Sequence, residues 1–264
     1  RQSNCGWVTP GVLCFSLPHL ANVTSFSLGL SCSITDEDLF AFLGQLPCLE
    51  TLELQYYLQL NSPRIGPRLP RLHSFTACHP SINTAPGAAS LCSWIRRIIA
   101  RAPLVHLRLL CDSLNRRTHN AHVALTGLVE HLAAVHTATL RTLDLGGALL
   151  GVSALTLLYG ACTALEELRA GLGVRGFVHV RRGDPPHLHT AVVRVLNAPH
   201  RALVVSAAEA GEIMRSSAAL RRLAVDDARW EGSWTSQDGG VEFVVGEWRV
   251  PTDIAYFTTI LRKE

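Results

Sequence analysis

A pattern of the form L-x-x-L-x-L recurs along this chain of 264 residues, and it constrains the fold more than any other feature of the sequence. Strict copies begin at Leu49, Leu104 and Leu140. Looser copies, with other residues at some of the leucine positions, begin at Val23, Leu72, Leu165, Leu220 and, most weakly, His200. Because an internal repeat determines the architecture of a whole chain, the rest of the sequence has to fit around these segments.

Helical patterns fill the intervals between the copies. Thr35 and the acidic residues after it are typical of a helix start, and apolar residues then recur at helical spacing as far as Leu46. A second amphipathic stretch covers residues 91–101 and is stopped by Pro103. Further helices are predicted at 124–135, 153–161, 189–196 and 207–216. Each copy of the pattern is therefore expected to be a short strand that follows a helix.

The alternation of short strands with helices predicts parallel strands joined by helical crossovers. Successive copies start 20 to 36 residues apart, whereas a leucine-rich repeat has a period of about 20 to 29 residues, so some units need insertions. We therefore expect an α/β protein, an irregular leucine-rich-repeat solenoid whose curved parallel sheet carries the helices on its convex side. The solenoid is predicted for residues 1–228, with no linker that would divide it.

Residues 229–264 differ in composition, and we expect them to cap the solenoid. Asp238-Gly239-Gly240 is typical of a tight turn between two strands, and aromatic residues flank it on both sides: Trp230, Trp234, Phe243 and Trp248. An end unit of a solenoid exposes an apolar flank, which a β-hairpin there would shield. The alternative is an aromatic platform that binds a partner.

The leucine positions of each predicted strand point into the core, so the intervening residues face outward on the concave sheet. These residues are small, polar and of mixed charge, which suits protein recognition better than contact with a phosphate backbone. The candidate protein-binding residues are Glu53, Gln55, His106, Arg108, Asp144, Glu167, Arg169, Arg222 and Asp226. The alternative is a sheet face that is merely solvated.

The charge balance gives no sign of an anionic partner. The formal net charge is +3 and the isoelectric point is near 8.5, with basic and acidic residues interleaved, so we expect no nucleic-acid binding. The eight cysteines form no C-x-x-C pair, which argues against a zinc ribbon and against a disulfide framework. Free thiols among apolar residues indicate a reducing compartment, the cytoplasm or the nucleus.

Several motifs that carry chemistry in other proteins are discounted. Gly171-Leu172-Gly173-Val174-Arg175-Gly176 has the spacing of a dinucleotide-binding loop, but the segment 177–180 is strand-like where such a loop needs a helix. His187 and His189 with Asp184 lack further metal ligands, and Asp226-Asp227 is interpreted as a turn. No nucleophile motif occurs, so we expect no catalytic residue, cofactor or metal, with an enzyme as a distant alternative.

Residues 145–165 form an uncharged run that is long enough to cross a bilayer. Glycines and hydroxyl side chains dilute its hydrophobicity, and both of its ends coincide with copies of the leucine pattern. We interpret this run as buried inside the solenoid and expect no membrane partner.

The repeat copies, Leu165-Glu166-Glu167-Leu168 and the run from Leu220 to Trp234 resemble the leucine-rich-repeat half of F-box proteins from mushroom-forming fungi. The resemblance implies a module that recognises the substrates of a ubiquitin ligase and has no catalytic residues of its own. An F-box docks the adaptor of a cullin-RING ligase and would precede the repeats, and residues 1–20 contain no such segment. The ligase adaptor would therefore bind through an upstream F-box, and the repeats would bind a protein target. The alternative is a free-standing repeat scaffold without a link to a ligase.

Overall fold

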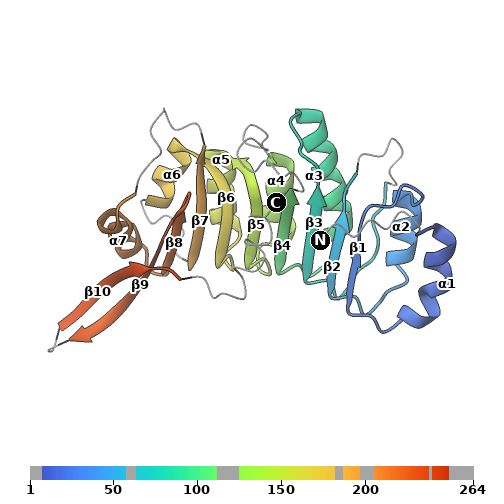
Figure 1. Ribbon diagram of the computed structural model, residues 1–264, viewed down its shortest axis with the longest axis horizontal. Coiled ribbons are helices and arrows are strands. Elements are labelled where there is room, and N and C mark those ends of the chain that lie inside the picture. The colour runs from blue at the N-terminus through green and yellow to red at the C-terminus, as the bar shows by residue number, and fades with distance from the viewer. Residues whose placement is uncertain are drawn as a thin grey trace, which may run out of the picture.

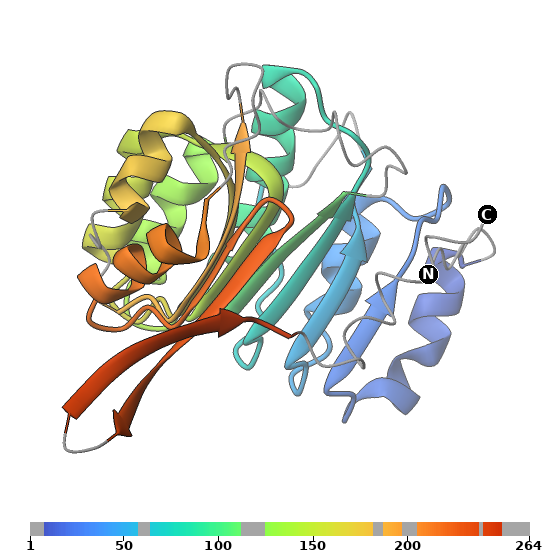
Figure 2. The same cartoon turned by 60° about the vertical axis from the view of Figure 1, so that its left-hand side comes forward.

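The computed structural model describes residues 8–57, 64–111, 125–181, 187–196, 205–237 and 240–249. They form an α/β structure with one ten-stranded sheet, in which the order of the strands across the sheet is their order in the chain. The strands β1 to β8 are all parallel, whereas β9 and β10 each run antiparallel to the strand before them. The helices lie on one face of the sheet (Figure 1 and Figure 2), and we call the opposite one the open face.

The register of the strands aligns the leucine pattern across the sheet. The strands are β1 (Ser25–Leu28), β2 (Thr51–Gln55), β3 (Ser74–His79), β4 (His106–Cys111), β5 (Thr142–Leu150), β6 (Glu167–Gly173), β7 (Thr190–Leu196), β8 (Arg222–Val225), β9 (Ala228–Gln237) and β10 (Gly240–Glu247). One row of paired positions runs from β1 to β8 as Phe26, Leu52, Phe75, Leu107, Leu143, Leu168, Ala191 and Leu223. From Leu52 onward no member of this row is more than 1% exposed, so these side chains are the sheet's contribution to the hydrophobic core.

Five of the helices lie where the sequence predicts them. The helices are α1 (Pro10–Leu20), α2 (Asp36–Leu43), α3 (Ala85–Ile99), α4 (Thr126–Val135), α5 (Val152–Ala161), α6 (Val174–Arg181) and α7 (Ala207–Ser216). Thr35 caps α2 in a capping box with Asp38, and Ser206 and Glu209 do the same for α7. The helix predicted from residue 91 begins earlier, at Ala85, because the Thr84 side chain caps it.

The hydrophobic core lies between the sheet and the helices and extends from Leu13 to Trp230 as one cluster. Trp94 of α3 is its largest fully buried side chain, and its ring lies 5.2 Å from that of Tyr56 and 6.1 Å from that of Phe75. Aromatic contacts of this kind stabilise the packing of α3 against β3 and against the residue that follows β2. The in-line sheet with a single core is compatible with a solenoid-like architecture.

Two predictions between residues 174 and 196 are wrong. The predicted helix at 189–196 forms strand β7, and the strand-like segment 177–180 lies in helix α6. Burial in β7 alternates between Ala191, Val193 and Val195 and their neighbours, which is the period of a strand with one buried face. The weak copy from His200 lies mostly outside the described residues, and Ala191 occupies the corresponding place in the buried row.

The predicted C-terminal hairpin is present as β9 and β10, which pair from Gln237 with Gly240 to Trp230 with Glu247. The Trp234 and Phe243 rings contact each other edge to face, with centroids 4.9 Å apart. A Cβ on Gly232 would lie 2.3 Å from the Phe243 ring, so a larger residue there would force the ring to move. Because β9 also pairs with β8, the sheet continues from the predicted solenoid into the predicted cap.

Candidate functional site

Two rows of mainly polar side chains cross the sheet on its open face. The first row contains Ser25, Thr51, Ser74, His106, Thr142, Glu167, Thr190, Arg222 and Glu231. The second contains Ser27, Glu53, Thr76, Arg108, Asp144, Arg169, Val192, Ala224 and Arg229. Seven of the nine candidate residues lie in these rows, where paired positions on adjacent strands are about 4.8 Å apart. The remaining two are Gln55 and Asp226.

The centre of the open face carries four charged side chains from three adjacent strands, which we call the central charge cluster: Arg108, Asp144, Glu167 and Arg169. Arg108 Nε lies 3.4 Å from Asp144 Oδ2. Arg169 donates from Nε to Glu167 Oε1 at 2.8 Å. The two arginines therefore stand on either side of Asp144, one strand away in each direction.

Asp144 is the most buried member of this cluster, with its side chain only 14% exposed. Burial raises the pKa of its carboxyl, and the Gly146 amide and the two neighbouring guanidinium groups act against that rise. The Gly146 N–H donates to Asp144 Oδ1 at 2.9 Å. Gly146 has φ +59°, a conformation that glycine adopts without a steric penalty, and the β5–β6 register shifts just after Asp144. This bulge fixes the carboxylate between the arginines.

His106 occupies the first row beside the cluster, with its side chain exposed on the open face. Partial burial of the ring lowers its pKa, and the neighbouring His73 adds to this effect while Glu167 opposes it. A lowered pKa leaves the imidazole neutral at pH 7, with one donor and one acceptor nitrogen. His106 therefore adds hydrogen-bonding capacity to the open face without adding charge.

A second group of contacts lies at the C-terminal end of the open face. Arg222 donates from Nε to Glu231 Oε1 at 2.7 Å across β8 and β9. Its guanidinium carbon also lies 5.7 Å from the centre of the Trp248 ring. A cation–π contact of this kind is attractive, so Trp248, one of the aromatic residues of the predicted cap, belongs to this part of the surface.

Two candidate residues lie away from the rows. Asp226 sits with φ +53° in the two-residue turn between β8 and β9, as the sequence predicts for Asp226-Asp227. Its Oδ1 accepts a hydrogen bond from the Val195 amide at 3.1 Å, so this carboxylate ties the turn to the end of β7. Gln55 is half-buried at the end of β2 and lines a pocket beside α2.

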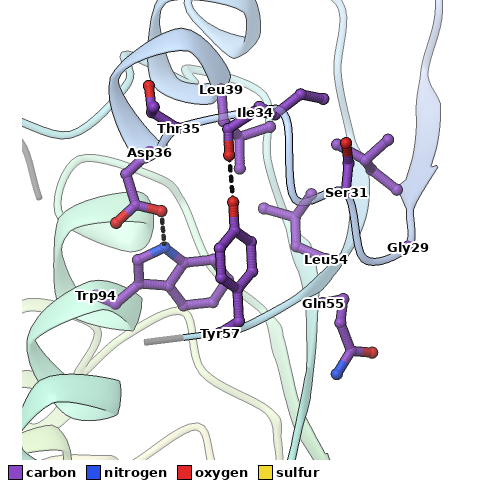
Figure 3. Close-up of a pocket in the computed structure, with 11 residues that line it drawn as sticks. Gly29, Ser31, Ile34, Thr35, Asp36, Leu39, Leu54, Gln55, Tyr57 and Trp94 are labelled. Carbon is purple, nitrogen blue, oxygen red and sulfur yellow. Dashed lines mark hydrogen bonds between the residues drawn. The ribbon is translucent and has the colours of Figure 1, made fainter. Parts of the chain in front are cut away.

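That pocket is too small for a ligand. It leaves only about 20 Å³ for the centre of a water-sized molecule, which is room for roughly one water. The Trp94 indole donates to Asp36 Oδ1 at 3.1 Å, and the Tyr57 hydroxyl donates to the Ile34 carbonyl. Figure 3 shows both hydrogen bonds as dashed lines. Asp36 is 5% exposed, so the hydrogen bond from Trp94 satisfies a buried carboxylate and joins α2 to α3. The residues around this pocket therefore have a structural role, because they join α2 to α3.

The discounted motifs have these positions in the structure. Gly171 and Gly173 end β6, and Gly176 lies in α6, so a helix follows the strand where the sequence predicts a strand at 177–180. His187 and His189 are exposed, and Asp184 lies outside the described residues. The described ranges contain no group of three or more His, Cys, Asp or Glu residues that could hold a metal ion.

The uncharged run 145–165 forms most of β5, all of α5 and the turn after it. Over the residues that the structure describes, no helix is long and apolar enough to cross a membrane. None of the seven described cysteines forms a disulfide, and Cys92 and Cys162 are buried. Burial raises the pKa of the Cys162 thiol to about 11, which keeps it protonated and unreactive at neutral pH.

No protein-family model matches this chain, and no curated protein matches it.

Proposed function

We propose that the open face is a protein-docking surface, and that the chain is the substrate-recognition part of an F-box-type ubiquitin-ligase adaptor built on leucine-rich repeats. The observation that carries the docking role is the central charge cluster, in which adjacent strands present Arg108, Asp144 and Arg169 side by side. A free-standing repeat scaffold would use the same surface, because docking does not depend on the link to a ligase.

The two arginines of the cluster suit recognition of a protein surface. Each uses its Nε for a neighbouring carboxylate, while the side chains of Arg108 and Arg169 are 55% and 39% exposed. A guanidinium has five N–H donors, so most of each fork remains available for carboxylates or carbonyls of a partner. Because Asp144 and Glu167 already hold these side chains, binding would cost less rotamer entropy than it does for mobile surface arginines.

The link to a ubiquitin ligase rests on the resemblance of the repeat copies and of the run from Leu220 to Trp234 to F-box proteins. The in-line order of the strands and their helical crossovers support a solenoid, the architecture that this family resemblance implies.

The docking role is tested by reversing charges on one face at a time. The double variant Arg108→Glu/Arg169→Glu changes the open face, and Glu130→Arg changes an exposed position on α4 as the matched control. We expect proteins that cross-link to the wild-type chain in its native cells to be lost with the double variant and retained with Glu130→Arg. Equal retention by both variants, with both folded by circular dichroism, would contradict the docking role.

The ligase link needs a separate experiment on the full-length gene product. We expect a cullin-RING adaptor to co-purify with it, independently of the open-face substitutions. Absence of ligase subunits, while the targets of the open face are still captured, would favour the free-standing scaffold.

A further inference from the structure

Helix α1 is apolar on both of its sides. It buries Leu13 against the core, with Leu17 and Leu20 packed beside it. The opposite side carries Val12 and Phe15, which are 51% and 81% exposed, together with the exposed His19. A helix on the surface of a protein normally presents polar residues on its outer side, whereas two of these three residues are apolar. The outer side of α1 is therefore suited to contact with an apolar surface.

The strand beside α1 has an unpaired edge. Within the described residues β1 pairs with β2 alone, and Figures 1 and 2 show β1 and α1 together at one end of the molecule. The Thr51 amide donates to the Thr24 carbonyl at 2.9 Å. In a parallel ladder alternate residues bond to the same neighbouring strand, so the backbone groups of Phe26 also face β2, whereas those of Ser25 and Ser27 face outward. A free row of donors and acceptors is a template for a further strand.

Charge distinguishes this end from the other. Residues 2–35 contain no Asp, Glu, Lys or Arg, so neither α1 nor β1 carries a formal charge. The opposite edge strand, β10, carries Glu242 and Glu247. Charged side chains are a common protection against edge-to-edge pairing, and β1 lacks them.

We propose that this end of the sheet binds the same end of a second copy of the chain. Antiparallel pairing of the two β1 strands about a two-fold axis perpendicular to the sheet satisfies the outward groups of both copies. The α1 helices then lie on one side of the joined sheet, where Phe15 and Val12 of each copy can be covered. The neutral surface meets its own copy without like-charge repulsion, and it offers no charge complementarity to a charged partner.

The oligomeric state of the 264-residue chain tests this proposal. Sedimentation velocity over a hundredfold range of concentration should show a species of twice 28.7 kDa. Phe15→Asp removes the apolar contact, and Ser27→Pro removes an outward donor without removing a bond to β2. Each variant is expected to raise the dimer dissociation constant at least tenfold. Val241→Asp alters the 71% exposed side chain on β10 and is the matched control, for which we expect no change.

Three results would overturn the proposal. They are a monomeric wild-type chain at the highest concentration, a dimer that withstands both Phe15→Asp and Ser27→Pro, and a dimer that only Val241→Asp dissociates. A monomer whose Phe15 is nevertheless protected from solvent labelling would assign the cover to another segment of the same chain. Circular dichroism of each variant, matched to the wild type, excludes unfolding as the cause of dissociation.

Discussion

His136 and Asp144 are two titratable side chains that the fold buries in different ways. Asp144 has an amide donor and two guanidinium groups around it. His136 follows α4 and is 1% exposed, and its Nε2 has no hydrogen-bond partner within the described residues. Burial, and then the nearby His131, whose ring lies 5.5 Å away, lower the pKa of His136 to about 4. The folded chain therefore disfavours the protonated form of His136.

This burial predicts a loss of stability in acid. The unfolded chain has a histidine pKa of about 6.5, so between pH 6.5 and 4 it binds more protons than the folded chain. The free energy of unfolding should be at its full value above about pH 7 and fall as the pH drops, by up to about 3 kcal/mol from this group. Urea denaturation at pH 7.5, 5.5 and 4.5 measures this change in the free energy of unfolding. His136→Leu should flatten the profile, and an unchanged profile would contradict the assignment.

At the scale of elements, the N-cap of α2 gives a second prediction. Thr35 Oγ1 accepts from the Asp38 amide at 3.2 Å, and Asp38 Oδ2 accepts from the Thr35 amide at 3.1 Å. Thr35→Ala removes the cap and should lower the free energy of unfolding by about 1 kcal/mol. Thr35→Ser keeps the hydroxyl and should remain within a few tenths of the wild type. Equal losses in the two variants would mean that the hydroxyl does not stabilise α2.

Those elements whose apolar spacing matches a single period could be predicted from the sequence. The strands at Leu52 and Leu107 could be predicted because a leucine recurs two residues later in each. The helix after Thr35 could be predicted from its capping residue. Strand β7 was missed because its short apolar run also fits one side of a helix, and α6 was missed because the segment 177–180 has the composition of a strand. The central charge cluster followed from the strand positions, whereas the Gly146 bulge depends on tertiary packing around β5.

At the scale of the whole molecule, contacts between neighbouring units hold the sheet together, because among the described residues each strand pairs only with the strands next to it in the chain. Stability in such an array is approximately a sum of terms for each unit and for each boundary between units. A defect in the middle of the array therefore weakens two boundaries, whereas one at an edge strand weakens a single boundary.

Leu143 in β5 tests this arrangement at the centre of the sheet. It is 0% exposed and pairs with Leu107 on one side and Leu168 on the other. Leu143→Ala should lower the free energy of unfolding by roughly 2 to 5 kcal/mol, since it leaves a cavity in the core. Thr142→Ala, on the open face, should cost less than about 1 kcal/mol. Chemical denaturation of the two variants measures both losses of unfolding free energy. Similar losses would contradict the strand register that buries Leu143 and exposes Thr142 on the open face.

The reversal of chain direction at Asp226 bears on how such a molecule can change in length. After this turn β9 runs antiparallel to β8, and β10 runs antiparallel to β9, so β10 again has the direction of β1 to β8. A strand-and-helix unit added beside β10 would therefore find a parallel neighbour, but it would replace β10 as the edge strand. The same unit inserted between β3 and β4 would lengthen the sheet by about 4.8 Å and leave both edges as they are. Gene duplication within the parallel series can thus enlarge this molecule without changing either of its edge strands.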